Sequence, residues 1–238
     1  MGKDSVPRFL GWEYAKKGDY HHNLDPNWSY TPTYLQKRLF VEKMIWKLSP
    51  EARILDAGCG EGVLVEKFKA MGRRIEGIDL NYESDNVRRG SILNLPYADA
   101  SFEMVLLLDV LEHLTYGDQP LALAETHRVL KKGGSLLASI PNLAHLNSRF
   151  RFGLLGRLDR TDTELNHLGE RPAHENRRLL EKAGFRIAEV KGVTLTLPVV
   201  YRQVICRWPA KYRWLHDLLE PLAFPSLSMI NLFLCRKP

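Results

Sequence analysis

Residues 54–64, ILDAGCGEGVL, restrict the fold of this chain more than any other stretch. An apolar run ends at Asp56, and the alternating glycines Gly58, Gly60 and Gly62 follow before apolar residues resume. Glycine has no Cβ, so these positions permit a tight turn and let a ligand approach the backbone at the start of the next helix. The stretch predicts a strand, a ligand-binding turn and a helix. A turn that is tight for packing alone is the alternative.

The rest of the chain alternates short apolar runs with helical periodicity, which is typical of a parallel sheet covered by helices on both faces. We expect helices over residues 33–48, 61–71, 119–130 and 175–183, and strands over 53–58, 74–80, 102–109, 135–141, 185–193 and 229–235, with a weaker strand near Val87. The tetrapeptide KKGG at 131–134 is expected to form a turn between a helix and a strand.

The residues around the glycine turn indicate what it binds. The dinucleotide fingerprint GxGxxG would need a third glycine at position 63, where the chain has Val63. Asp56, at the end of the strand, would repel a pyrophosphate and suits a cationic ligand. Asp79 closes the second strand 21 residues after Gly58, the spacing at which an acidic side chain reaches ribose hydroxyls. The predicted ligand therefore carries a ribose and a positive charge and has no phosphates.

Several linked segments resemble a known family. They are ILDAGCGEGVL, GIDL at 77–80, LPYADASFEMVLLLDVLEHL at 95–114 and ETHRVLKKGGSLLASIPN at 125–142. Together they resemble the class I S-adenosylmethionine-dependent methyltransferases, close to the small-molecule enzymes of quinone biosynthesis. Residues 141–158 and 166–187 are similar to methyltransferases encoded in bacterial polysaccharide clusters. The resemblance implies an α/β fold: a Rossmann-like, seven-stranded, mostly parallel sheet with an antiparallel last strand and helices on both faces.

The resemblance also implies the cofactor, S-adenosyl-L-methionine, and its product, S-adenosyl-L-homocysteine. The residues that it assigns to the cofactor are Asp56, Gly58, Cys59 and Gly60 at the methionyl end, Asp79 at the ribose, Leu80, Ser91 and Ile92 at the adenine, and Asp109 and Val110 under the sulfonium. Ser91 stands where the family often has an acidic residue. Asp109 has a helix-capping role as its alternative. Cys59 is expected to be a small side chain that fills the turn, since no base lies beside it in the sequence.

An acceptor hydroxyl would need a group to receive its proton, and histidine is suited to this near neutral pH. Three histidines are candidates: His113 in DVLEHL, His145 after the strand that ends at 141, and His167 in TELNHLGE. Glu112 would orient a neighbour or lie exposed on a helix. No spaced set of ligands predicts a metal site. Tyr30 and Tyr34 would either cover the cofactor or pack in the core.

Composition adds limits. The formal net charge of +6 is compatible with anionic partners and equally with solubility alone. The three cysteines are scattered and form no CxxC pair, so we expect a reducing, cytoplasmic setting without disulfides. The N-terminus has no apolar leader-like stretch, and no run is long enough to predict a membrane span.

One domain over 1–238 is expected, with a lid or helical segment at 1–48, a cofactor-binding core at 49–142 and a substrate-side insertion with the rest of the sheet at 143–238.

Residues 199–224 interleave basic and aromatic side chains. This pattern suits an amphipathic cover that contacts lipid head groups or a lipid-linked substrate. It equally suits a helical insertion packed beside the final strands.

The leading functional prediction is a methyltransferase acting on a small molecule or a sugar- or lipid-linked acceptor, most simply at oxygen. An RNA methyltransferase or RNA-binding module is an alternative, suggested by the basic residues between Arg149 and Arg160; DVLE, however, stands where a DNA amino-methyltransferase has its proline-rich tetrapeptide. A nicotinamide-dependent oxidoreductase is a second alternative, opposed by Val63 and Asp56. The acceptor and the oligomeric state are left open.

Overall fold

The computed structural model describes residues 24–158 and 167–238. Residues 1–23 of the expected lid or helical segment at 1–48 lie outside the described residues.

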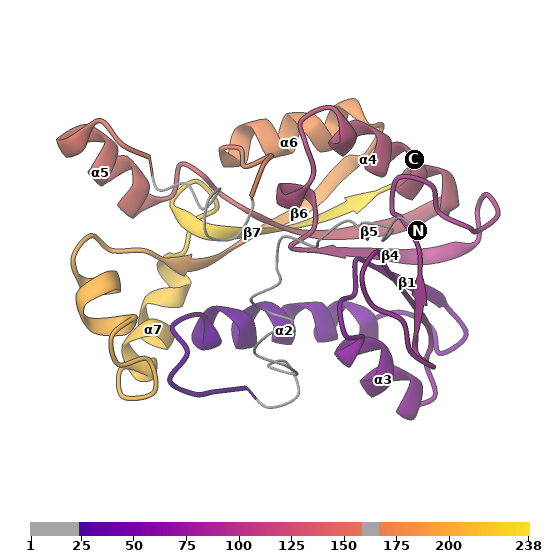
Figure 1. The fold of residues 1–238 in the computed structure, drawn as a ribbon, viewed down its shortest axis with the longest axis horizontal. Helices are drawn as coiled ribbons and strands as arrows, with labels where there is room; N and C mark the ends of the chain where they lie inside the picture. Colours follow the sequence, from indigo (N-terminus) through magenta and orange to yellow (C-terminus); the bar gives the residue numbers. More distant parts are fainter. Residues whose placement is uncertain (1–23, 159–166) are drawn as a thin grey trace, which may run out of the picture.

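A seven-stranded sheet forms the centre of the molecule (Figure 1), in the order β3-β2-β1-β4-β5-β7-β6. The strands are β1 (Arg53–Ala57), β2 (Arg74–Asp79), β3 (Val87–Arg89), β4 (Phe102–Leu108), β5 (Leu130–Pro141), β6 (Arg186–Leu195) and β7 (Ser228–Arg236). The first five run parallel, and β7 is antiparallel to both β5 and β6. The predicted α/β class, the mostly parallel sheet and the antiparallel last strand are confirmed.

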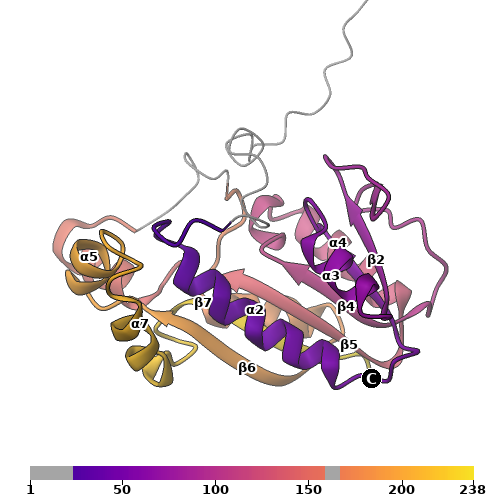
Figure 2. The same cartoon turned by 90° about the horizontal axis from the view of Figure 1, so that it is seen from below.

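Helices cover both faces of the sheet. They are α2 (Thr31–Trp46), α3 (Val63–Ala70), α4 (Asp118–Val129), α5 (Leu146–Leu155), α6 (Ala173–Lys182) and α7 (Arg213–Leu219), with short turns η1 (Leu111–His113), η2 (Tyr201–Ile205) and η3 (Glu220–Leu222). Figure 1 shows α4 and α6 on one face, and α2 and α3 on the other. Figure 2, seen from the α2 side, shows α2 lying across the sheet.

Two apolar clusters fill the space between the sheet and its helices. Successive strand residues point to opposite faces, so Ile54 joins the cluster under α2 and α3 while Leu55 joins the one under α4 and α6. Leu106 and Leu107 of β4 divide in the same way. The apolar runs of the sequence are continuous, not alternating, because both faces of these strands are buried.

Two expected boundaries were wrong. The helix expected from residue 61 begins at Val63, because Gly62 before it has a left-handed φ of +80° and cannot continue a helix. The expected turn at 131–134 is part of β5, which starts at Leu130 directly after α4. Gly133 has φ +74°, and the pairing register with β4 shifts here, so these residues form an irregularity within the strand.

Residues 199–224 form a helical insertion between β6 and β7, as one of the two hypotheses for this segment predicted. His216 of α7 contacts the Thr194 hydroxyl of β6 at 3.0 Å, and Glu220 accepts a hydrogen bond from the Thr194 amide. Lys191 of β6 also pairs with Glu220, at 3.6 Å, so the insertion is attached to β6 through polar contacts with two of its residues.

The packing of α3 against the sheet can be tested at Phe68. Its side chain is fully buried, and its ring lies 5.5 Å from the Trp46 ring of α2. We expect Phe68→Ala to lower the free energy of unfolding by about 3–5 kcal/mol, because it removes buried apolar surface and leaves a cavity. Urea denaturation measures this. Leu39→Ala is the control, since Leu39 is 62% exposed and its loss should change stability by less than about 0.5 kcal/mol.

Candidate active site

The carboxyl ends of β1, β2 and β4 meet at one edge of the sheet. These strands are parallel neighbours, with Asp56 opposite Gly77 of β2 and Leu106 of β4. The residues that follow each strand therefore lie close together, at the edge where open parallel sheets bind ligands.

Glycine is required at the three positions of the turn for different structural reasons. Gly58, Gly60 and Gly62 all have positive φ, at +80°, +55° and +80°. A Cβ on Gly58 would lie 2.5 Å from a methyl group of Val110, and one on Gly62 would lie 2.5 Å from a methyl group of Val87. A Cβ on Gly60 would meet no atom within 4 Å. Gly60 thus borders open space, where a ligand can reach the backbone.

The amides of this turn are used within the protein, contrary to the expectation that they point at a ligand. Gly58 and Cys59 donate to the Ile78 carbonyl, and Gly62 donates to Cys59. Gly60 donates to the Asp79 carboxylate at 2.9 Å. With these four amides bonded, the turn offers less to an anion than a phosphate-binding loop does.

Asp79 joins the two loops that follow β1 and β2. Besides the Gly60 amide, its carboxylate accepts hydrogen bonds from the amides of Asn81 and Tyr82. The side chain is 9% exposed, so its orientation is fixed before any ligand binds. This places a carboxylate beside the open space at Gly60.

Asp56 is a second buried carboxyl group beneath the turn, 3% exposed. Burial raises its pKa to about 7; the charge of Asp79 adds to this effect, and the charge of Lys37 opposes it. Asp56 is therefore partly protonated near neutral pH.

Asp109 lies directly after β4, with a left-handed φ of +56° that is uncommon for a residue other than glycine. Its carboxylate contacts Lys37 Nζ, the Ser139 hydroxyl and the Tyr30 hydroxyl. Burial alone would raise the pKa of Asp109, but these contacts, with Lys37 foremost, hold it below its usual value. The side chain does not cap η1, which has Val110 as its N-cap and no side-chain cap.

Lys37 is a functional residue that the sequence analysis missed. It lies in α2 and is 6% exposed. Its ammonium pairs with Asp109 and lies within 6 Å of the Tyr30 and Tyr34 rings, at 5.5 and 5.7 Å. A signal was present: Lys37 is four residues before Val41, on the buried stripe of an amphipathic helix, where a lysine needs a partner.

Two of the three candidate histidines come together. The rings of His113 and His167 lie edge to face with their centroids 4.8 Å apart, and His167 Nδ1 is 2.8 Å from a carboxylate oxygen of Glu170. Glu112 was expected to lie exposed or to orient a neighbour. It is 1% exposed, because η1 turns its side chain inward. Burial first, and then the charge of Asp109, raise its pKa well above the usual value.

His145 has other partners. It is the N-cap of α5, where Nδ1 accepts from the Ser148 amide, and it contacts the Thr196 hydroxyl at 2.8 Å. Burial lowers its pKa to about 4, so it is neutral near pH 7 and a weak base there.

The remaining candidates line the turn and the loop after β3. Leu80 is 50% exposed, as a side chain that packs on a ligand would be. Ile92 is nearly buried, and the Ser91 hydroxyl accepts from the Leu93 amide. Cys59 packs against Gly77, where a Cβ would lie 2.8 Å from its sulfur. Burial, with Asp56 and Asp79 nearby, raises the pKa of its thiol and disfavours a nucleophilic thiolate.

Comparisons with known proteins agree with this geometry. Residues 55–138 match the family model described as "Methyltransferase domain". A protein of Mycolicibacterium smegmatis named "Probable S-adenosylmethionine-dependent methyltransferase" is 37% identical over 152 residues, which are 59% of this chain and 54% of that protein. A malonyl-[acyl-carrier protein] O-methyltransferase of Erwinia pyrifoliae is 31% identical over 156 residues, 61% of this chain and 55% of that protein.

The fold has solved counterparts as well. A crystal structure of an S-adenosylmethionine-dependent methyltransferase from Thermotoga maritima matches with a TM-score of 0.60 and 18% identity, and the match covers 96% of this chain and 99% of that one. At this level of identity the likeness concerns the fold.

Fold, turn and comparisons define a class I S-adenosylmethionine-dependent methyltransferase domain, with S-adenosylmethionine as its cofactor. The match to this family is with residues 55–138 of the chain. It spans about half the length of the curated relatives it matches. The residues present fit the cofactor, because Asp56 and Asp79 provide negative charge beside the open space at Gly60. Among the described residues, no helix is both long and apolar enough to cross a membrane.

Asp56 should make cofactor affinity depend on pH. A sulfonium favours the carboxylate, so binding S-adenosylmethionine must remove the proton that Asp56 keeps below a pKa of about 7. We expect affinity to rise up to about tenfold from pH 6 to pH 8, with proton release on binding. Calorimetry in buffers of different ionisation enthalpy measures both. Uncharged S-adenosylhomocysteine should show a smaller change.

Asp56→Asn removes the titrating group. The affinities for S-adenosylmethionine and S-adenosylhomocysteine should then depend on pH to the same extent. Asp85→Asn, at an exposed carboxylate after β2, is the matched control and should keep it. The same linkage acts on stability: because the folded-state pKa lies above the unfolded value, the empty wild-type protein should lose stability as the pH rises from about 4 to 7. A pH-independent affinity for S-adenosylmethionine in the wild type would contradict this role for Asp56.

Proposed function

We propose that this protein transfers a methyl group from S-adenosylmethionine to a hydroxyl oxygen of a small acceptor, and that the acceptor is a sugar or another polar group linked to a lipid. The use of S-adenosylmethionine is supported by one observation above all. Two buried acids, Asp56 and Asp79, lie at the glycine turn, and Gly60 of this turn borders open space. This arrangement suits a cationic nucleoside.

When bound, the cofactor supplies an electrophilic methyl carbon, and the protein has to align the acceptor and exclude water. Asp79 would hold the ribose and Asp56 would favour the cation. Asp109, kept ionised by Lys37, adds negative charge after β4. Tyr30 donates to Asp109 from the start of α2, so this helix closes one side of the same site.

Oxygen is supported as the acceptor atom by the O-methyltransferase of Erwinia pyrifoliae. The proton that a hydroxyl loses would leave the acceptor near η1, where His113 and His167 meet. The RNA alternative keeps the same domain and differs only in the acceptor; a gel shift that weakens steeply with salt would favour it. The nicotinamide alternative has no support from the comparisons, which name methyltransferases.

Asp79→Ala tests the cofactor site. It should weaken binding of S-adenosylhomocysteine by more than tenfold, because the ribose loses its acceptor. It should also cost about 1–2 kcal/mol of stability, since the Gly60, Asn81 and Tyr82 amides lose a partner. Titration calorimetry and urea unfolding measure the two effects.

Asp85→Ala, on the exposed part of the same loop, should change neither quantity. If the wild-type protein shows no saturable binding of S-adenosylhomocysteine, the proposed function is wrong. Both effects are compared as free energies. If Asp79→Ala loses no more binding free energy for S-adenosylhomocysteine than free energy of unfolding, Asp79 has only a structural role.

The lipid-linked acceptor is supported by an exposed apolar surface at one end of the molecule. Both views place α5 and α7 at this end (Figures 1 and 2). The surface consists of Phe150, Phe152, Leu154, Leu155 and Leu158 around α5, and of Trp208, Trp214, Leu218, Leu222 and Phe224 in the insertion, each between 38% and 67% exposed. The Leu146 amide donates to the Leu227 carbonyl and Arg149 donates to the Ser226 carbonyl, so the start of α5 adjoins the end of the insertion.

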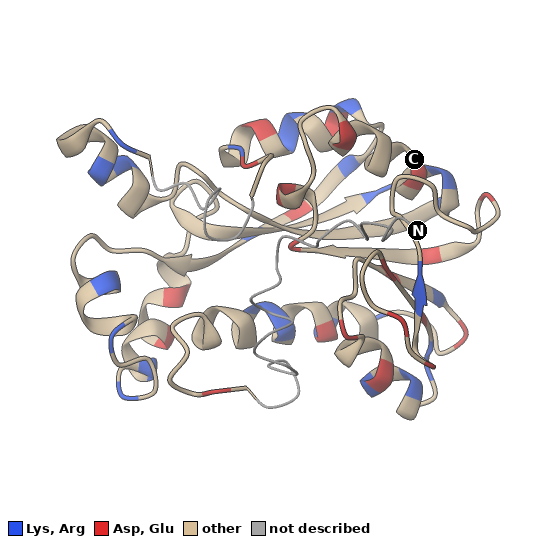
Figure 3. Ribbon diagram, viewed as in Figure 1, with Lys and Arg blue, Asp and Glu red and all other residues tan. Residues whose placement is uncertain are grey.

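Positive charge accompanies this apolar surface. Arg149 and Arg157 flank the apolar residues of α5, and Arg202, Arg207 and Lys211 are exposed in the insertion. Figure 3 shows basic residues on both segments. Exposed aromatic and apolar side chains interleaved with arginine and lysine suit an anionic lipid surface.

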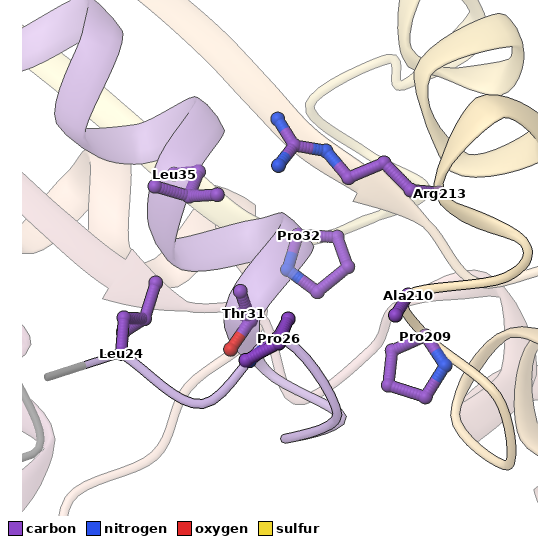
Figure 4. Close-up of a pocket in the computed structure, with 8 residues that line it drawn as sticks. All are labelled: Leu24, Pro26, Thr31, Pro32, Leu35, Pro209, Ala210 and Arg213. Carbon is purple, nitrogen blue, oxygen red and sulfur yellow. The ribbon is translucent and has the colours of Figure 1, made fainter.

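A cavity of about 290 Å³ lies between the insertion and the start of α2 (Figure 4). Its lining is mostly apolar: Leu24, Pro26, Pro32, Leu35, Pro209 and Ala210, with Thr31 and Arg213 as the polar members. None of these residues belongs to the glycine turn. The cavity suits part of a hydrocarbon chain better than it suits the cofactor, whose contacts lie at the carboxyl ends of β1, β2 and β4.

Vesicle sedimentation tests the lipid surface. We expect the protein to sediment with phosphatidylglycerol vesicles at low salt and to be released by high salt. Leu154→Ser/Leu155→Ser should reduce the bound fraction several-fold, because both side chains are more than 60% exposed. Leu121→Ser, 55% exposed on α4, is the control. Absence of sedimentation would remove the lipid part of the proposal and leave the methyltransferase part intact.

A further inference from the structure

The segment after β4 and the segment before α6 bring three side chains with metal-binding groups together. Glu112 and His113 lie in η1, and His167 lies directly before the turn that leads to α6. One ligand atom of each lies within 4.8 Å of the others. We propose that Glu112, His113 and His167 bind a divalent transition-metal cation on the acceptor side of the cofactor site. The inference rests on the proposed function and adds the means by which the acceptor is bound.

Glu112 is the first argument. Its side chain is 1% exposed, and within residues 24–158 and 167–238 neither carboxylate oxygen has a hydrogen-bond partner. A buried carboxylate without partners is costly, and native proteins keep one where it is protonated, paired or bound to a metal. Two imidazoles adjoin Glu112, and a cation held between them would satisfy its oxygens.

The second argument is the contact between His167 and Glu170. Glu170 is 5% exposed, and its carboxylate lies 2.8 Å from His167 Nδ1. Histidines that bind metals commonly donate their other ring nitrogen to a carboxylate, which fixes the tautomer and the ring orientation. With Nδ1 directed at Glu170, Nε2 is the nitrogen that would bind the cation.

The donor set indicates the kind of cation. Two imidazoles and one carboxylate suit Zn²⁺, Co²⁺ or Mn²⁺, whereas Mg²⁺ and Ca²⁺ prefer oxygen ligands throughout. Atoms that share a metal at about 2.1 Å lie roughly 3–4 Å apart, so the 4.8 Å limit requires side-chain movements of about an ångström. Three protein ligands leave positions open for water or for a hydroxyl.

The location gives such a cation a role in the reaction. Glu112 follows Asp109 by three residues, and η1 begins three residues after the last residue of β4. A hydroxyl bound to the cation has a lowered pKa and loses its proton to water. Its oxygen then forms a bond to the methyl carbon while the carbon–sulfur bond breaks, the electron pair remaining on sulfur. The cation keeps its oxidation state throughout.

Cobalt titration of the full, chelator-treated chain tests the proposal. We expect saturable visible absorption from Co²⁺ bound to nitrogen and oxygen ligands, displacement of Co²⁺ by Zn²⁺, and a rise in melting temperature with either ion. Mg²⁺ should bind far more weakly. Glu112→Gln should weaken Co²⁺ binding at least tenfold and should not lower the stability of the metal-free protein, since glutamine has nearly the same shape and no hydrogen bond of the carboxylate to another described residue is lost. His174→Ala, on exposed α6, is the matched histidine control and should bind Co²⁺ like the wild type.

His167→Ala provides a second variant should Glu112→Gln fold poorly, and it should also lose Co²⁺ binding. Equal Co²⁺ affinity in the wild type and in both variants would overturn the proposal, as would an absence of saturable binding. Binding of S-adenosylhomocysteine by the chelator-treated protein reports separately on the cofactor site. The two proposals can therefore fail independently.

Discussion

Four carboxyl groups gathered at one edge of a parallel sheet are the constraint on which the rest of this structure depends. Asp56, Asp79, Asp109 and Glu112 are each compensated differently. Asp79 accepts hydrogen bonds from three backbone amides, Asp109 pairs with Lys37, and Asp56 retains a proton. The Glu112 oxygens have no hydrogen-bond partner among the residues that the structure describes. The folded chain thus supplies less positive charge than this edge can take up. The cationic cofactor would supply positive charge beside Asp56 and Asp79, and the proposed metal ion would supply it beside Glu112.

The parts of this edge that the sequence predicted are those encoded by short-range spacing. The glycine turn and Asp79 at the end of the second strand follow from strand–turn–helix patterns and their spacing, whereas Asp109 was assigned through the family resemblance. The antiparallel last strand came from the family resemblance and not from periodicity. Leu106 and Leu107 show why the strands were recognisable: neighbouring residues are both buried, which gives the continuous apolar run of a central strand.

Contacts made across long sequence separations were not predictable. Lys37 meets Asp109 across 72 residues, and that contact exists only because α2 lies across the sheet with its lysine facing inward. From the sequence, Glu112 is expected to lie exposed at the polar start of a helix. In the structure, η1 is a single turn, and the Gly169 amide donates a hydrogen bond to the Glu112 carbonyl, so the chain at Gly169 packs against η1. His167 lies beside Glu112, with a ring nitrogen within 4.8 Å of a carboxylate oxygen. Tertiary packing outweighs local polarity at both positions.

The division between the two halves of the site explains why the cofactor was easier to infer than the acceptor. The family match ends at residue 138, whereas His145, α5, His167 and the insertion at 199–224 all follow it. A shared cofactor can be recognised by one arrangement of turn and acids, which short sequence motifs reveal. Acceptor recognition needs a shape particular to each substrate. In this chain that part combines a buried histidine and glutamate cluster with an exposed apolar and basic end. A polar reacting group attached to a hydrocarbon anchor is the kind of acceptor that would use both.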